Sequence, residues 1–102
     1  MIVDEKVNSS DYYSVGYCPE LRKYIITITT TDHTTQYNRY FEITKFEYID
    51  FESLSWLADE LVKKGPTSDR FLYSEKSNEN TLENVRYKKF FESYLQNYTY
   101  MI

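Results

Sequence analysis

The chain has 102 residues, a net charge of −4 and 19% aromatic residues, most of them tyrosine. The length predicts a single domain, residues 1–102, and Cys18 as the one cysteine excludes an intrachain disulfide. The acidic balance argues against nucleic-acid binding, which needs basic surface, and is compatible with a basic protein as partner.

Residues 1–10 are polar and are compatible with either a loose N-terminal arm or a short edge strand. They have neither the basic nor the apolar segment of a secretion signal. No stretch of the sequence approaches the ~20 apolar residues of a membrane span. We therefore expect the protein to act in the cytoplasm.

Three segments with alternating or β-branched residues follow, over 12–18, 23–31 and 36–43. Pro19 ends the first segment, and Asp32, His33 and Thr34 are typical of a turn between the second and third. The short connections predict an antiparallel meander.

The period then changes from strand to helix. Thr44 and Glu47 have the spacing of a capping box, which predicts a helix from Lys45 with a bend or break near Asp50. A clear helical pattern covers residues 51–64 and ends at Gly65. We expect its apolar stripe to face the core, and the stripe comprises Phe51, Leu54, Ala58, Leu61 and Val62.

Residues 70–74 predict a fourth strand, residues 75–80 a polar loop, and residues 81–97 a second helix capped by Thr81. The aromatic stripe of that helix is also expected to face the core, and it comprises Tyr87, Phe90, Phe91, Tyr94, Leu95 and Tyr98. The predicted fold is α+β in the order β-β-β-α-β-α, with an antiparallel sheet of about four strands and two helices packed on one face.

The sequence contains no recognisable catalytic arrangement. His33 is its one histidine and falls in a predicted turn, and nothing in the sequence brings it to Cys18. Gly16 and Gly65 are the only glycines, which excludes a glycine-rich phosphate loop. The acids lack the clustering of a metal site. We therefore expect a protein that is not an enzyme and needs no cofactor or metal.

Trp56 falls opposite the apolar stripe of the first long helix, with Glu52, Asp59 and Glu60 within side-chain reach. If this face is exposed, it offers an aromatic anchor ringed by carboxylates for a basic protein surface. Alternatively, the N-terminal arm or a second subunit covers Trp56.

Acids are concentrated from residue 42 to residue 60, where six acids and one base give a local balance of −5. A solvated helix face explains part of this concentration, and an acidic patch that neutralises a basic cleft explains it equally well. The expected partner-binding residues are Glu42, Glu47, Asp50, Glu52, Trp56, Asp59, Glu60, Glu75 and Glu79.

Residues 70–81, which follow the acidic amphipathic helix, read Arg-Phe-Leu-Tyr-Ser-Glu-Lys-Ser-Asn-Glu-Asn-Thr. This part of the chain resembles small bacterial immunity proteins of contact-dependent growth inhibition and related polymorphic toxin systems. The resemblance implies a cytoplasmic protein that binds a cognate toxin domain, commonly a nuclease, over its active site, and it transfers no individual binding residues. The alternatives are a phage-encoded inhibitor or nucleic-acid mimic, and a homo-oligomeric accessory domain.

Overall fold

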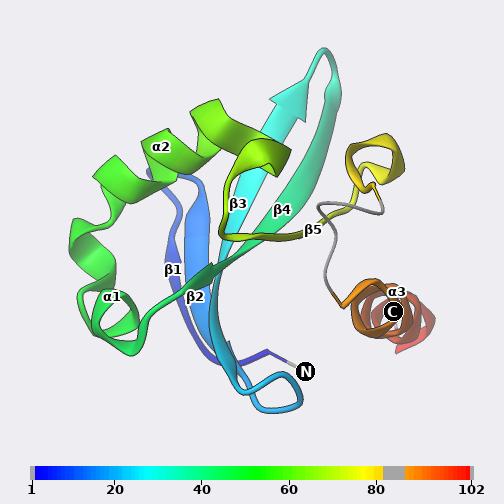
Figure 1. Cartoon of the computed structure of the whole chain (residues 1–102), viewed down its shortest axis with the longest axis horizontal. Helices are drawn as coiled ribbons and strands as arrows, with labels where there is room; N and C mark the ends of the chain where they lie inside the picture. The colour runs from blue at the N-terminus through cyan, green and yellow to red at the C-terminus, as the bar shows by residue number, and fades with distance from the viewer. Residues whose placement is uncertain (1, 82–86, 102) are drawn as a thin grey trace.

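The computed structural model describes residues 2–81 and 87–101, with side chains for 2–81 and 87–94. Its strands form one antiparallel sheet in the order β1-β2-β3-β4-β5 (Figure 1). The strands are β1 (Val3–Asn8), β2 (Tyr13–Cys18), β3 (Lys23–Asp32), β4 (Thr35–Ile43) and β5 (Phe71–Ser74). The helices are α1 (Lys45–Ile49), η1 (Phe51–Ser53), α2 (Ser55–Lys64), η2 (Gly65–Thr67), η3 (Ser77–Glu79) and α3 (Lys88–Met101).

The α+β class and the antiparallel meander are confirmed, but the sheet has five strands rather than about four. The additional strand is β1, so the N-terminal segment is an edge strand and not a loose arm. It lies close to β2 at Gly16, where a Cβ atom would come within 2.5 Å of Ile2 Cγ2. The absence of a side chain at this position lets the first strand join the sheet.

The sheet has a hydrophobic core on each face, so the prediction that both helices pack on one face is wrong (Figure 1). One core lies under α1 and α2, and the other is centred on Phe91 of α3. Neighbouring strand residues such as Ile25 and Ile26 point to opposite faces and are both buried, so each face of the sheet needs a cover. The first core comprises Tyr13, Val15, Ile26, Ile28, Phe41, Ile43, Leu54, Leu57, Ala58, Leu61 and Phe71.

The break expected near Asp50 is confirmed, since α1 ends at Ile49 and the 3-10 turn η1 separates it from α2. The capping box of Thr44 and Glu47 is also confirmed. The stripe predicted for residues 51–64 needs one correction, because Val62 is 47% exposed while Leu57 is buried. Since Phe51 belongs to the 3-10 turn, the α-helical phase starts later and turns Leu57 toward the sheet.

The strand predicted at 70–74 is β5, which pairs with β4 across a bulge that brings Phe71 opposite Phe41. The polar segment 75–80 contains the short turn η3. The described part of the last helix begins at Lys88. The prediction that this helix begins at a cap on Thr81 stays untested, because residues 82–86 lie outside the described residues. Phe91 is buried as predicted, but Tyr87, which was predicted to face the core, is 41% exposed. The side chains of Leu95 and Tyr98 lie outside the described residues.

Candidate protein-interaction surface

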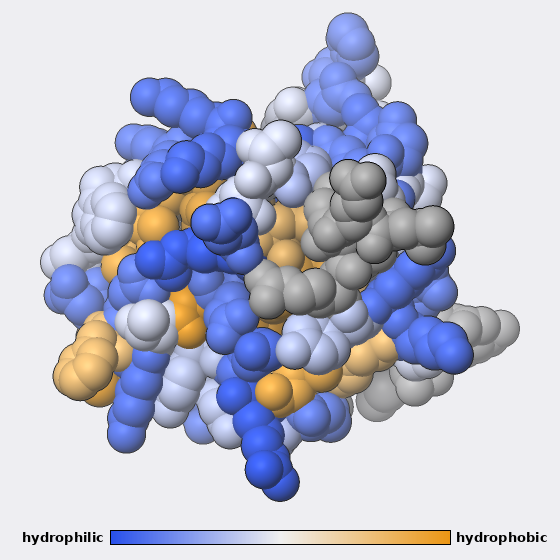
Figure 2. All heavy atoms as spheres, viewed as in Figure 1, coloured by the Kyte–Doolittle hydropathy of each residue, from blue (hydrophilic) through white to orange (hydrophobic). Residues whose placement is uncertain are grey.

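Helix α1 buries none of its five residues. Phe46 is 83% exposed and Ile49 is 62% exposed, although both are large and apolar. Figure 2 shows hydrophobic atoms at the molecular surface over this part of the fold, next to hydrophilic ones. Tyr48 is half-buried and packs against the core, whereas Phe46 and Ile49 gain little stability from burial. Exposed apolar side chains that lie close together are typical of surfaces that contact another molecule.

Polar contacts nevertheless hold α1 in place. The guanidinium of Arg70 donates two hydrogen bonds to the carboxylate of Glu47. Arg70 Nη1 donates to Glu47 Oε1 at 2.8 Å, and Arg70 Nη2 donates to Glu47 Oε2 at 2.9 Å. Tyr48 donates its hydroxyl to the carbonyl of Asp4 at 2.6 Å, and Lys6 Nζ lies 4.1 Å from the centre of the Tyr48 ring. The helix is thus attached both to β1 and to the segment before β5, and its exposed side chains are presented on a fixed backbone.

Trp56 is 59% exposed on α2, which confirms that it faces away from the core. The N-terminal segment does not cover it, because that segment is strand β1 at the sheet edge. Glu52 and Asp59 are exposed, and neither forms an ion pair within the described residues. Glu60 instead pairs with Lys64 at 3.0 Å on the surface of the helix.

We call the outer side of α1, η1 and α2 the helical surface. Its side chains are exposed except for the half-buried Glu60, and it comprises Phe46, Ile49, Asp50, Glu52, Trp56, Asp59 and Glu60. It combines three large apolar side chains with four carboxylates on consecutive helices that cover the same face of the sheet. Anchors of this size surrounded by acids suit a partner with an apolar pocket bordered by basic residues.

Two of the acids predicted to bind a partner instead hold the fold together. Partial burial raises the pKa of Glu47, but the hydrogen bonds with Arg70 and Thr44 and the charge of Arg70 together outweigh burial and leave the pKa below its usual value. Burial likewise raises the pKa of Glu79, and the hydrogen bonds from Arg39, with further ones from Ser74 and Tyr37, more than offset this and lower the pKa to about 2. These carboxylates stay ionised because the protein itself supplies their partners.

Two further predicted acids belong to the face of the sheet that α3 covers. Glu42 follows Tyr40 and Phe41 along β4 and accepts a hydrogen bond from Lys23 Nζ at 3.0 Å. Glu75 accepts from the backbone amide of Asn38 at 2.7 Å and from the Tyr40 hydroxyl at 3.3 Å. The structure therefore does not bring all nine predicted residues together on one surface.

The residues with catalytic potential lie apart in the fold. His33 is almost fully exposed in the β3–β4 turn, where its φ is 55°, whereas Cys18 is fully buried in the core under α3. Over residues 2–81 and 87–94, no three His, Cys, Asp or Glu side chains are grouped so as to hold a metal ion. None of the helices that the structure describes is both long enough and apolar enough to cross a membrane.

Sequence reasoning missed Phe46 and Ile49 as surface residues. A signal was present, because the capping box and the expected break at Asp50 together leave a helix of little more than one turn. So short a helix contributes few side chains to a core.

Comparison of the chain with protein-family models, curated proteins and solved structures finds no match in any of the three.

Proposed function

We propose that the protein acts in the cytoplasm as an immunity protein, which binds a basic toxin domain and occludes its active site without catalysing a reaction. The observation that carries this proposal is the helical surface. Phe46 and Ile49 are held exposed on an anchored helix, Trp56 is exposed on α2 one turn before the exposed Asp59, and Glu52 is exposed in the preceding turn η1. A nuclease toxin would offer the basic, phosphate-binding cleft that such a surface complements.

In the mechanism that we propose, apolar side chains supply the binding energy, and acidic side chains attract the basic partner and replace substrate phosphates. Trp56, Phe46 and Ile49 supply desolvated contacts, and aromatic anchors of this kind dominate the binding energy of many interfaces. Glu52 and Asp59 speed the encounter with a basic surface and take the positions of substrate phosphates. Because hydrogen bonds already fix α1, little conformational entropy is lost when it binds.

The segment that resembles immunity proteins, residues 70–81, supports the helical surface indirectly. Arg70 holds α1 through Glu47, and Glu79 joins the end of β5 to β4 through Ser74 and Arg39. We therefore place the contacts with the toxin on α1 and α2, and assign to this segment the role of fixing the helices on the sheet.

The experiment is affinity capture from the native source with the wild-type protein, followed by an activity assay of the captured protein. We expect a basic protein whose toxic activity is lost when an equimolar amount of the wild-type chain is added. Capture of a host DNA-binding enzyme would favour a phage-encoded inhibitor instead. A stable dimer in sedimentation that buries Trp56 would favour a homo-oligomeric domain and contradict the proposal.

A further inference from the structure

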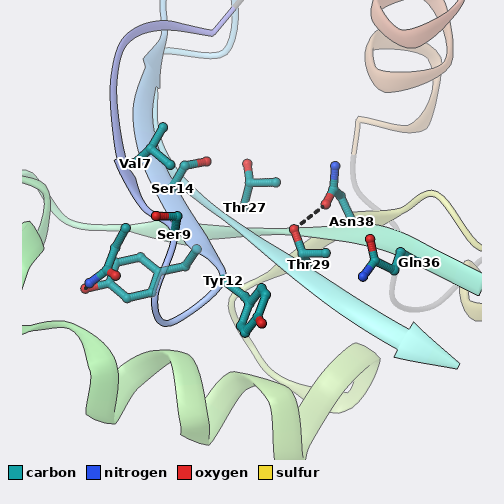
Figure 3. A pocket seen from close by; sticks show the side chains of 10 residues that line it. Val7, Ser9, Tyr12, Ser14, Thr27, Thr29, Gln36 and Asn38 are labelled. Carbon is teal, nitrogen blue, oxygen red and sulfur yellow. Dashed lines mark hydrogen bonds between the residues drawn. The ribbon is translucent and has the colours of Figure 1, made fainter.

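The face of the sheet that carries α3 is covered only in part. Beyond the helix lies an open hollow of about 400 Å³ on the strands (Figure 3). No lining residue is charged, although 27% of the chain is charged. The lining comprises Val7, Asn8, Ser9, Tyr12, Tyr13, Ser14, Thr27, Thr29, Gln36 and Asn38.

The hollow is lined by neutral hydrogen-bonding groups from the four neighbouring strands β1 to β4. Ser14 lies opposite Thr27, and Thr29 lies opposite Asn38 in the register of the sheet. Thr29 Oγ1 donates to Asn38 Oδ1 at 3.0 Å (Figure 3), and the Asn38 side chain also hydrogen-bonds to Tyr40. Within the described residues, the side chains of Ser14, Thr27 and Gln36 make no hydrogen bond.

An aromatic ring borders the hollow at the β1–β2 turn. Tyr12 is 65% exposed and has a φ of 59°, and its carbonyl accepts a hydrogen bond from the amide of Thr29 at 3.0 Å (Figure 3). A second hollow of about 290 Å³ shares Ser14, Thr27 and Asn38 with the first and reaches Tyr94 on α3. The two hollows adjoin at these three residues, and we call them together the furrow, which extends from Tyr12 to Tyr94.

We propose that this furrow binds a neutral oligosaccharide. Hydroxyl and carboxamide groups match the alternating donors and acceptors of sugar hydroxyls, and the Tyr12 ring offers an apolar surface for the carbon-bound hydrogens of a sugar ring. The larger hollow lies within the range of roughly 300–1,000 Å³ that is common for small-molecule sites.

The charges around the furrow narrow the class of ligand. The lining of both hollows contains no lysine or arginine, so nothing there would balance a phosphate or a carboxylate. Glu5 and Glu75, which line the smaller hollow, would repel an anionic sugar. An extended peptide binds a sheet mainly through main-chain hydrogen bonds at its edge, whereas Ser14, Thr27 and Asn38, which line both hollows, lie on the inner strands β2, β3 and β4. The site is independent of the helical surface, which lies over the opposite face.

The experiment is an NMR titration of the wild-type chain, in which the amide signals are followed. The probes are neutral trisaccharides of glucose, mannose, galactose and N-acetylglucosamine, an uncharged glycine–serine peptide, and inorganic phosphate. We expect at least one trisaccharide to shift the amide signals of Ser14, Thr27, Thr29 and Asn38, and we expect neither the peptide nor phosphate to do so.

Variants test whether the furrow itself binds the sugar. Thr27→Val keeps the side-chain shape and removes one hydroxyl, which should weaken binding about threefold to tenfold. Tyr12→Asn tolerates the positive φ and removes the ring, and Ser14→Ala replaces Thr27→Val if that variant fails to fold. Trp56→Ala, on the opposite face, is the control and should bind like the wild type. The proposal is overturned if no trisaccharide shifts the furrow signals, if the variants bind like the wild type, or if the peptide binds instead.

Discussion

Glu79 is the centre of a largely buried polar network that joins β4, β5 and η3. Its carboxylate accepts hydrogen bonds from Arg39 at 2.6 and 2.9 Å, from the Tyr37 hydroxyl at 2.9 Å and from the Ser74 hydroxyl at 2.7 Å. The side chains of Arg39 and Glu79 are only 11% and 15% exposed. Glu79→Gln keeps the shape of the side chain but leaves Arg39 without its counter-ion.

The pKa of Glu79 gives the size of the expected loss. Burial raises this pKa, but the hydrogen bonds from Arg39, Ser74 and Tyr37, together with the charge of Arg39, more than offset burial and lower the pKa from 4.5 to about 2. That difference corresponds to about 3 kcal/mol of folding free energy, which is a large share of the ~5–15 kcal/mol typical of a domain. Because the pKa is lower in the folded state, the stabilisation is complete above pH 4.5 and is lost as the pH falls toward 2.

The assay is urea unfolding followed by circular dichroism between pH 7 and pH 2. We expect Glu79→Gln to lose about 3 kcal/mol at pH 7 and to approach the wild type near pH 2, where the wild-type carboxylate becomes protonated. Glu60→Gln is the matched control, because its exposed pair with Lys64 should contribute less than ~1 kcal/mol. Equal stability of Glu79→Gln and wild type at pH 7, or a gap that stays constant down to pH 2, would refute the structural role of Glu79.

Three further substitutions test the packing and the exposed surface. Gly16→Val places atoms 2.5 Å from Ile2 Cγ2 and 3.1 Å from the carbonyl of Val3, so it should cost about 1–3 kcal/mol and speed hydrogen exchange across β1. Protected β1 amides would contradict this. Phe91→Ala removes a fully buried ring whose centroid lies 5.3 Å from that of Tyr73, and denaturant unfolding should show a loss of about 3–5 kcal/mol. Trp56→Ala should leave stability within about 0.5 kcal/mol of the wild type, and a larger loss in the same assay would show that the ring packs against the fold.

Much of the fold could be predicted from local pattern. The three central strands follow from their alternation and β-branched residues, and the capping box at Thr44 marks the start of α1. The pairing of β1 was harder to foresee, because its polar residues show little alternation and its place depends on the close approach at Gly16. The second layer was missed because β3 carries apolar residues on both of its faces, as Ile25 and Ile26 show.

The candidate site could be predicted from the sequence only where the period of one helix determines which side chains are exposed. Trp56 was placed correctly, since the period of one helix fixes which way its side chains point. Whether a carboxylate is available to a partner depends on distant residues. Glu47 meets Arg70 and Glu79 meets Arg39, which are 23 and 40 positions away in the sequence, so the local concentration of acids gave no sign of these pairs.

The most direct test of the helical surface is the affinity of the purified partner for the wild type and three surface variants, measured by calorimetry. Trp56→Ala, Glu52→Lys and Asp59→Lys should each weaken the complex by at least ~1–2 kcal/mol, or about fivefold to thirtyfold, without changing the fold. Lys89→Ala, on α3, is the control and should bind like the wild type. Unchanged affinity in all three variants would place the interface elsewhere and contradict the proposed role of α1 and α2.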